Sequence, residues 1–252
     1  EEFLGFDKIL VKDTSDYCPD FSINKKAFDN IVLYPKVKEE IITGISNWYV
    51  SKDWYKNHQL IHKLGILLYG EPGCGKSSII RAISTLLNNA QLIIIDQSSI
   101  NRSENIFDSI LQKREEVSGP IIVVFEDFDL MVYNRDDDKI DSDCLKIQGF
   151  QNKIMQILDG IYSTEDTIFI ATTNHIEKID KALIRAGRFD IQEEILPFDY
   201  PRVMEFLKLF DKGEEFYKEN IEGKYQLPIQ PAKLQSIIME DRAKELIKDY
   251  VK

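Results

Sequence analysis

Residues 66–77 are Ile-Leu-Leu-Tyr-Gly-Glu-Pro-Gly-Cys-Gly-Lys-Ser, and this stretch decides the fold. Its first four residues form an apolar run with the length of a buried strand. The pattern G-x-x-x-x-G-K-S follows at once, and Lys76 to Leu87 predicts a helix that opens directly on the loop. In that setting the backbone N–H groups turn inward around anionic oxygens, and the helix dipole adds positive charge. The stretch predicts a phosphate-binding loop; a strand–helix turn that binds nothing is the alternative.

The residues of this loop are assigned to ATP and Mg²⁺. Lys76 can bridge the β- and γ-phosphates, and the Ser77 hydroxyl can ligate the metal ion. Cys74 occupies a variable position of the pattern, so we expect its backbone alone to take part. The predicted nucleotide-binding residues are Gly70, Glu71, Pro72, Gly73, Cys74, Gly75, Lys76, Ser77 and Ser78.

Strands and helices alternate along most of the chain. The predicted strands are Gly65 to Tyr69, Leu92 to Ile95, Ile121 to Phe125, Thr167 to Thr172 and Ile191 to Leu196. The predicted helices lie around residues 37–49, 76–87, 106–111 and 150–158. This order predicts an α/β fold whose mostly parallel five-stranded sheet is flanked by helices. Beyond Pro197 the pattern turns helical, so we expect a large α/β domain over 1–197 and a small helical domain over 198–252.

Carboxylates follow the third predicted strand, in the run Glu126-Asp127-Phe128-Asp129. The carboxyl end of a parallel strand beside a phosphate loop is where ligands bind in open α/β sheets. We assign Glu126 to Mg²⁺ and Asp127 to the attacking water, by position. Asp129 is expected to be structural, for example as a cap of the next helix. The alternative for the whole run is a solvated strand end.

Asn174 ends the fourth predicted strand, where it can hydrogen-bond the γ-phosphate or the attacking water. Arg185 and Arg188 come shortly after and lie on either side of Gly187. Such arginines are expected to reach a neighbouring subunit's γ-phosphate in trans. The alternatives are a plain turn at Asn174 and surface salt bridges to Asp180 or Asp190.

Composition narrows the class of protein. The chain has 252 residues, 43% of them apolar and 30% charged, and a net charge of −11, which disfavours a nucleic-acid surface. No apolar run approaches the ~18 residues of a membrane span. Three cysteines, Cys18, Cys74 and Cys144, fit neither a metal site nor a disulfide framework, so we expect a reducing intracellular compartment. Because the chain starts with Glu1, it is interpreted as a fragment, and any upstream targeting or membrane segment would lie outside this sequence.

Together these motifs resemble the AAA domain of the Bcs family. The resemblance covers roughly residues 28–245. It is carried by Leu67-Leu68-Tyr69-Gly70, Pro72 to Ser78, Glu126 to Asp129, Leu158-Asp159-Gly160, Thr172 to Glu177, Arg188-Phe189-Asp190 and Ile229 to Gln235. The Glu-then-Asp order at Glu126 is that family's own inversion of the usual AAA order. Glu71 and Ala186 each replace a usual proline, and neither change removes a functional group.

The resemblance implies ATP hydrolysis by a ring of roughly six or seven subunits that moves or remodels a protein client. The family's mitochondrial member moves a folded iron–sulfur subunit across the inner membrane. The resemblance therefore implies that location, with the cytoplasm as the alternative, and membrane contact only through a segment absent from this chain.

Two other functions compete with this interpretation. A nucleic-acid motor or loader uses the same ATPase core, and a nucleotide-gated scaffold would bind without turnover. Residues 96–105 contain no aromatic residue and no glycine with which to grip an extended chain. We therefore expect a ring that opens and closes around a folded client or a membrane-side cavity through rotation of the helical domain. Threading by another loop, such as the acidic residues 134–143, is the alternative.

Overall fold

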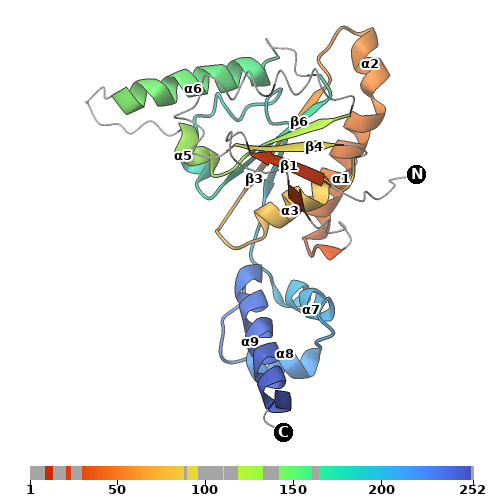
Figure 1. Ribbon diagram of the computed structural model, residues 1–252, viewed down its shortest axis with the longest axis vertical. Helices are drawn as coiled ribbons and strands as arrows, with labels where there is room; N and C mark the ends of the chain where they lie inside the picture. Colours follow the sequence, from red (N-terminus) through yellow and green to blue (C-terminus); the bar gives the residue numbers. More distant parts are fainter. Residues whose placement is uncertain are drawn as a thin grey trace.

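A seven-stranded sheet lies inside the larger part of the molecule, uppermost in Figure 1. Its strand order is β2-β1-β4-β5-β6-β3-β7. The strands are β1 (Ile9–Asp13), β2 (Phe21–Ile23), β3 (Lys63–Tyr69), β4 (Gln91–Ile95), β5 (Ile121–Phe125), β6 (Thr167–Thr173) and β7 (Ile191–Glu194). The computed structural model describes residues 9–13, 21–23, 30–87, 90–95, 110, 119–132, 142–160 and 165–250; for 9–13, 21–23, 142–148 and 245–250 it describes the backbone alone.

The five predicted strands are confirmed as five adjacent parallel strands, β4, β5, β6, β3 and β7. Strand β3 lies between β6 and β7, so that Ile66 pairs with both Ile170 and Ile191. The sequence did not predict β1 and β2, which extend the sheet beyond β4 in parallel and antiparallel pairing respectively. Strand β1 contains only three consecutive apolar residues, Ile9 to Val11, and β2 is three residues long, so neither forms a long apolar run.

Helices cover both faces of the sheet, which explains why the central strands β3, β4, β5 and β6 are largely apolar. The helices of this part are α1 (Pro35–Val50), α2 (Lys52–Asn57), α3 (Lys76–Ile83), α5 (Phe128–Val132) and α6 (Ser142–Leu158). One apolar core joins α1 and α3 to the sheet, and a second joins α5 and α6 to its other face. The helix expected around 106–111 lies largely outside the described residues.

Three helices at the C-terminal end share a hydrophobic core, to which Val32 also contributes. They are α7 (Tyr200–Lys208), α8 (Glu214–Asn220) and α9 (Pro231–Tyr250), and Figure 1 shows them gathered apart from the sheet. Asp199 caps α7 by accepting a hydrogen bond from the Arg202 N–H at 3.1 Å. The helical domain over 198–252 stays a prediction.

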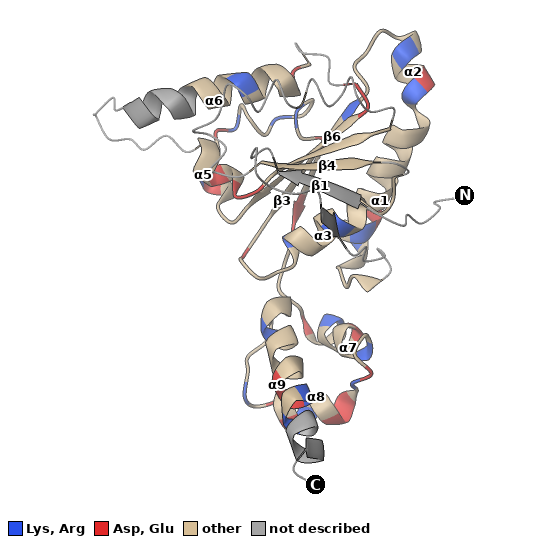
Figure 2. Cartoon of the chain, in the orientation of Figure 1, with Lys and Arg blue, Asp and Glu red and all other residues tan. Residues whose placement is uncertain are grey.

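Charged residues are frequent on the helices, whereas the central strands β4, β5 and β6 have none. In Figure 2, α2, α7, α8 and α9 carry both blue and red, whereas β4 and β6 are tan. Among the described helices, none is long and apolar enough to cross a bilayer.

Candidate functional site

The predicted phosphate loop connects the end of β3 to the start of α3. Its three glycines have positive φ, +136° at Gly70, +79° at Gly73 and +98° at Gly75. At Gly70 a β-carbon would also lie 2.4 Å from the Ile195 carbonyl oxygen, so a side chain there has no room. Because α3 begins at Lys76, the loop ends at a free helix N-terminus. This is the backbone shape in which N–H groups surround a bound phosphate.

Lys76 is held among oxygen atoms beside this loop, with 9% of the residue exposed. Its Nζ donates hydrogen bonds to the carbonyls of Gly70, at 2.6 Å, and Glu71, at 2.9 Å, and to Asn174 Oδ1, at 2.7 Å. Burial lowers the pKa of this ammonium, while the nearby Asp127 is among the groups that act in the opposite direction. The cation is therefore held by acceptors that an anionic ligand can replace.

The acidic pair follows β5 at the same edge of the sheet. The Glu126 N–H donates to the Ile95 carbonyl at 3.1 Å, which continues the pairing with β4. Asp127 is exposed and has φ +49°, and its N–H donates to Thr172 Oγ1 at 3.3 Å. A non-glycine residue in this region carries conformational strain of about 1 kcal/mol, which aspartate tolerates better than most residues. The turn holds both carboxylates next to the phosphate loop.

Asp129 is a buried structural residue, 2% exposed. Its Oδ1 accepts a hydrogen bond from the Thr173 hydroxyl at 2.6 Å, and Thr173 Oγ1 in turn accepts from the His175 N–H at 2.9 Å. Asp129 lies inside α5 rather than before it, so this link replaces the capping role expected from the sequence. It joins α5 to the end of β6, where Asn174 follows.

A cavity of about 680 Å³ contains most of the predicted residues, a size typical of small-molecule sites. Its lining from the sheet side is Pro72, Gly73, Gly75, Lys76, Ser77, Ser78, Glu126, Asp127, Thr172 and Asn174. Gly70 and Glu71 contribute through their carbonyls to Lys76, and the Cys74 side chain lies in the apolar core, consistent with a backbone role.

The other wall of the cavity was not predicted from the sequence. It consists of Asn30, Phe206, Leu209, Phe210, Pro231, Ala232 and Gln235. Two hydrogen bonds join this wall to the loop, from the Ala232 N–H to the Gly73 carbonyl at 3.1 Å and from Gln230 Nε2 to Glu71 Oε2 at 3.0 Å. Apart from the resemblance at Ile229 to Gln235, no motif marks these residues, because their contacts with the loop span more than half the chain.

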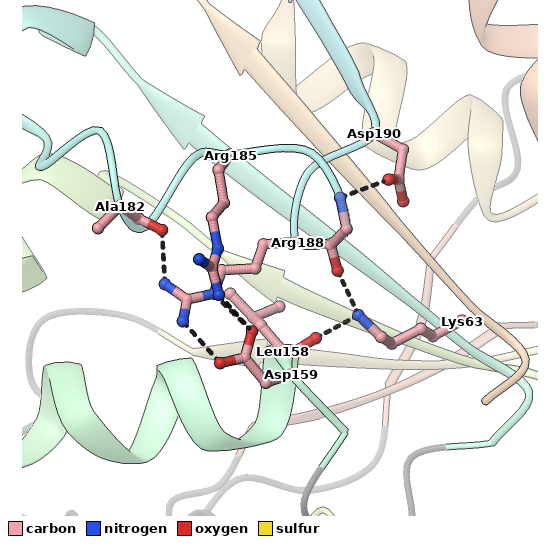
Figure 3. Close-up of polar contacts among 8 residues, drawn as sticks. Lys63, Leu158, Asp159, Ala182, Arg185, Arg188 and Asp190 are labelled. Atoms are coloured by element: carbon pink, nitrogen blue, oxygen red, sulfur yellow. Dashed lines mark hydrogen bonds and ion pairs between the residues drawn. The ribbon is translucent and has the colours of Figure 1, made fainter. Parts of the chain in front are cut away.

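The two arginines lie outside the lining of this cavity. Figure 3 shows their contacts with Asp159 and Ala182. Arg188 is 6% exposed, and its guanidinium donates to both oxygens of Asp159, at 2.7 and 2.6 Å, and to the Ala182 carbonyl at 2.5 Å. This contact holds the pKa of Asp159 below its usual value and raises that of Arg188. The expected alternative partners, Asp180 and Asp190, do not form this pair.

Arg185 is placed differently from Arg188. Its side chain is 62% exposed, and its guanidinium lies 3.7 Å from Asp159 Oδ1. Such an exposed contact is weak and leaves the guanidinium free to turn toward another molecule. Of the two arginines, Arg185 is therefore the one whose charge is accessible in this arrangement.

Comparison with known proteins identifies the family of the segment that contains most of this site. Residues 66–196 match the family described as ATPase family associated with various cellular activities (AAA). The probable mitochondrial chaperone BCS1-B of Dictyostelium discoideum is 29% identical over 241 residues, 85% of this chain and 52% of that protein. The mitochondrial chaperone BCS1 of Bos taurus is 32% identical over 175 residues, 68% of this chain and 40% of that protein. That of Homo sapiens is 28% identical over 225 residues, with 85% and 52% covered. The chain thus spans about half the length of the curated relatives that it matches.

Proposed function

The chain belongs to the AAA family of ATPases, is Bcs1-like over most of its length, and we propose that it hydrolyses Mg-ATP to move or remodel a protein client. The observation that carries this proposal is the convergence of Lys76, Glu126, Asp127 and Asn174 on one cavity beside the glycine loop. Phosphate release by the full chain with Mg-ATP tests it, and a chain that binds ATP without turnover would instead be a nucleotide-gated scaffold.

Each of these groups has a distinct proposed part in the reaction. Lys76 exchanges its carbonyl partners for the β- and γ-phosphates, and the loop N–H groups surround the same oxygens. The oxygen donors of Ser77 and Glu126 suit Mg²⁺, which prefers a few protein ligands and keeps several waters. When bound, that ion neutralises phosphate charge. Asp127 orients and deprotonates the attacking water, and Asn174 hydrogen-bonds that water or the γ-phosphate.

The second wall of the cavity, formed by Asn30 and by residues from the C-terminal helices, suits the base of the nucleotide. Phe206, Leu209 and Phe210 supply apolar surface, and Gln235 and Asn30 supply polar atoms for its edge. Because Ala232 and Gln230 contact the phosphate loop, loss of the γ-phosphate can be passed to α9 and move the helices after residue 198 as a unit. This motion is the proposed source of work on the client.

We propose that Arg185 completes the site of a neighbouring subunit in a ring of roughly six or seven copies. Arg188, paired with Asp159, is better placed to hold the turn that presents Arg185; its own role in trans stays a prediction. Chains carrying Lys76→Ala keep an intact Arg185, and chains carrying Arg185→Ala keep an intact phosphate loop. Mixing the two inactive variants should therefore restore hydrolysis, and a fully active monomer at every concentration would contradict the ring.

The client and the location are inferred from the relatives, which are named as mitochondrial chaperones. We propose a folded protein client, a reducing compartment, and membrane contact through a segment outside this sequence, with the mitochondrial inner membrane as the favoured site. A client with a stably folded fluorescent domain tests this, because loss of fluorescence that depends on Asp127 would show threading.

The prediction of a folded client depends on residues 96–105 and 134–143. These lie outside the described residues, apart from the backbone of Ser142 and Asp143. Anisotropy titration with DNA tests the nucleic-acid alternative.

A further inference from the structure

Lys63 makes contacts that the nucleotide site does not use. It is the first residue of β3, at the opposite end of the strand from the phosphate loop. Its partly buried ammonium donates hydrogen bonds to the carbonyls of Leu158 and Gly187, the latter at 2.5 Å (Figure 3). Burial lowers the pKa of this lysine, and Asp190 and Asp159 oppose that shift. Lys63 is therefore a structural tie rather than a solvated surface charge.

The Gly187 carbonyl belongs to the turn that carries both arginines. Gly187 has φ +83°, and its N–H donates to Asp190 Oδ1 at 2.9 Å. The N–H groups of Arg188 and Phe189 both donate to the Arg185 carbonyl, each at 3.1 Å. These bonds make a compact turn, so a displacement at Gly187 changes the position of the Arg185 backbone.

Strand β3 holds the same turn at a second point. The Asp190 N–H donates to the Gly65 carbonyl at 2.9 Å, and a β-carbon on Gly65 would lie 1.7 Å from the Arg188 carbonyl oxygen. The backbone contact at Gly65 fixes the end of the turn, and Lys63, two residues earlier on the strand, fixes its middle.

The other acceptor of Lys63 connects the turn to α6. Leu158 is the last residue of that helix, and carbonyls at a helix end have no partner within the helix. The next residue is Asp159, whose carboxylate holds Arg188 and lies 3.7 Å from Arg185. The end of α6 and the arginine turn therefore converge on one ammonium group.

We propose that Lys63 is a positioning residue for Arg185, tying the turn at Gly187 to the end of α6 so that Arg185 meets the neighbouring subunit's nucleotide in one orientation. The inference rests on the proposed trans role of Arg185. Lys63 lies on the strand that leads into its own subunit's phosphate loop, but by this proposal it serves the nucleotide site of the neighbouring subunit. The competing explanation is that Lys63 supports its own phosphate loop through β3.

Mixing experiments in the full chain separate these explanations. Lys63→Met keeps the length and the apolar stem of the side chain and removes the hydrogen-bond donors. It should lower kcat about 10-fold or more, because a misplaced catalytic group is costly, and leave ATP affinity by calorimetry within about twofold. Mixed with Lys76→Ala chains, which have an intact arginine turn, it should recover phosphate release. Mixed with Arg185→Ala chains it should not recover, because neither partner presents a working arginine.

Three further variants serve as controls. Lys52→Met removes a lysine that also bonds an oxygen, Asp166 Oδ2 at 2.7 Å, and that has no bond to the turn; it should retain wild-type kcat. Lys63→Arg keeps donors and should retain more activity than Lys63→Met. Gly187→Ala has open space for its β-carbon but an unfavourable φ, so it disturbs the turn directly. It should behave as Lys63→Met does, and it takes that variant's place if Lys63→Met does not fold.

The outcomes distinguish the inference from the function on which it rests. Recovery of Lys63→Met by Arg185→Ala chains but not by Lys76→Ala chains would assign Lys63 to its own phosphate loop and overturn the inference. Wild-type kcat in both Lys63→Met and Gly187→Ala would overturn it as well. If Lys76→Ala and Arg185→Ala chains fail to complement each other, the trans role of Arg185 is wrong, and the inference falls with it.

Discussion

The two ends of β3 carry charged sites of opposite design. After Tyr69, the loop is open to a cavity, and Lys76 binds acceptors that a phosphate can replace. At the other end, where β3 begins, carbonyl groups and Asp159 surround the charged groups of Lys63 and Arg188. Arg185 is also near Asp159, but its side chain is mostly exposed. The first site is built to exchange a ligand, and the second is built to hold one side chain in place. Burial and partners separate these roles, since both sites are rich in the same residue types.

The largest expected effect is on the chemistry at the open end. Asp127→Asn should bind ATP and slow hydrolysis by about 100-fold or more, because the general base is lost. Glu126→Gln should instead raise the Mg²⁺ concentration required for half-maximal activity. Phosphate release measured across a Mg²⁺ series distinguishes them. The reverse pattern in the two variants would exchange the roles assigned to these carboxylates.

A smaller effect, on ATP affinity, distinguishes Lys76, at the end of the phosphate loop, from Lys63, at the start of β3. Lys76→Ala should weaken ATP binding about 10-fold or more, because it removes a charge-assisted contact to the phosphates. Calorimetry in Mg²⁺ measures this, with Lys63→Met as the matched control that keeps its affinity. Equal affinities in Lys76→Ala and the parent chain would refute the phosphate assignment.

The closed end is expected to matter for stability. Arg188→Ala leaves Asp159 and the Ala182 carbonyl without their donors and should lower the free energy of unfolding by about 1–3 kcal/mol, toward the lower end because Asp159 is partly exposed. Arg185→Ala should change it by less than about 0.5 kcal/mol, since that side chain is mostly in solvent. Urea unfolding of both variants gives the comparison, and equal losses would mean that the two arginines are held alike.

The smallest effect concerns two neighbouring carboxyl groups, Glu40 on α1 and Glu193 on β7, with Lys36 nearby. Burial, with a hydrogen bond to Glu40, raises the pKa of Glu193 from 4.5 to about 7, and Lys36 lies 3.5 Å from Glu40. Because the pKa of Glu193 is higher in the folded state than in the unfolded state, its protonated carboxyl group stabilises the fold. This contribution is complete below about pH 4.5 and is lost as the pH rises through about 7. Glu193→Gln should thus be more stable than the parent by about 0.5 kcal/mol above neutral pH, with the difference vanishing near pH 5. Thermal unfolding across this pH range measures the difference in stability between the two chains. A difference that does not change with pH would contradict the raised pKa of Glu193.

Much of the open site is predictable from the sequence because its residues are local to strand ends. Parallel strands bring their carboxyl ends to one edge, so the positions after β3, β5 and β6 are neighbours in any such sheet. This is why the sequence alone groups Lys76 with Asp127 and Asn174. The apolar wall from α7 and α9 has no such rule, because its place depends on how the C-terminal helices pack.

The closed site was harder to predict for the same reason. Nearby acids in the sequence, Asp180 and Asp190, were natural partners for Arg188, whereas Asp159 lies 29 residues away and meets it through the packing of α6. Lys63 carries no motif and is separated from Gly187 by 124 positions. In the fold, β1 and β2 were missed because β1 contains only three consecutive apolar residues and β2 is only three residues long, too little for a strand pattern to show.

The close approach at Gly65 has a consequence for evolution. A hydrogen atom is all that fits there, because the obstacle is the Arg188 backbone rather than a movable side chain. Gly44 is the counterexample, since a β-carbon there would meet the tip of Ile191, which can rotate away. Selection can therefore accept substitutions at Gly44 with small adjustments nearby, whereas Gly65 can change only in a lineage that has also rebuilt its arginine turn. In an alignment of descendants, Gly44 should therefore vary more than Gly65, although both lie close to the start of β7.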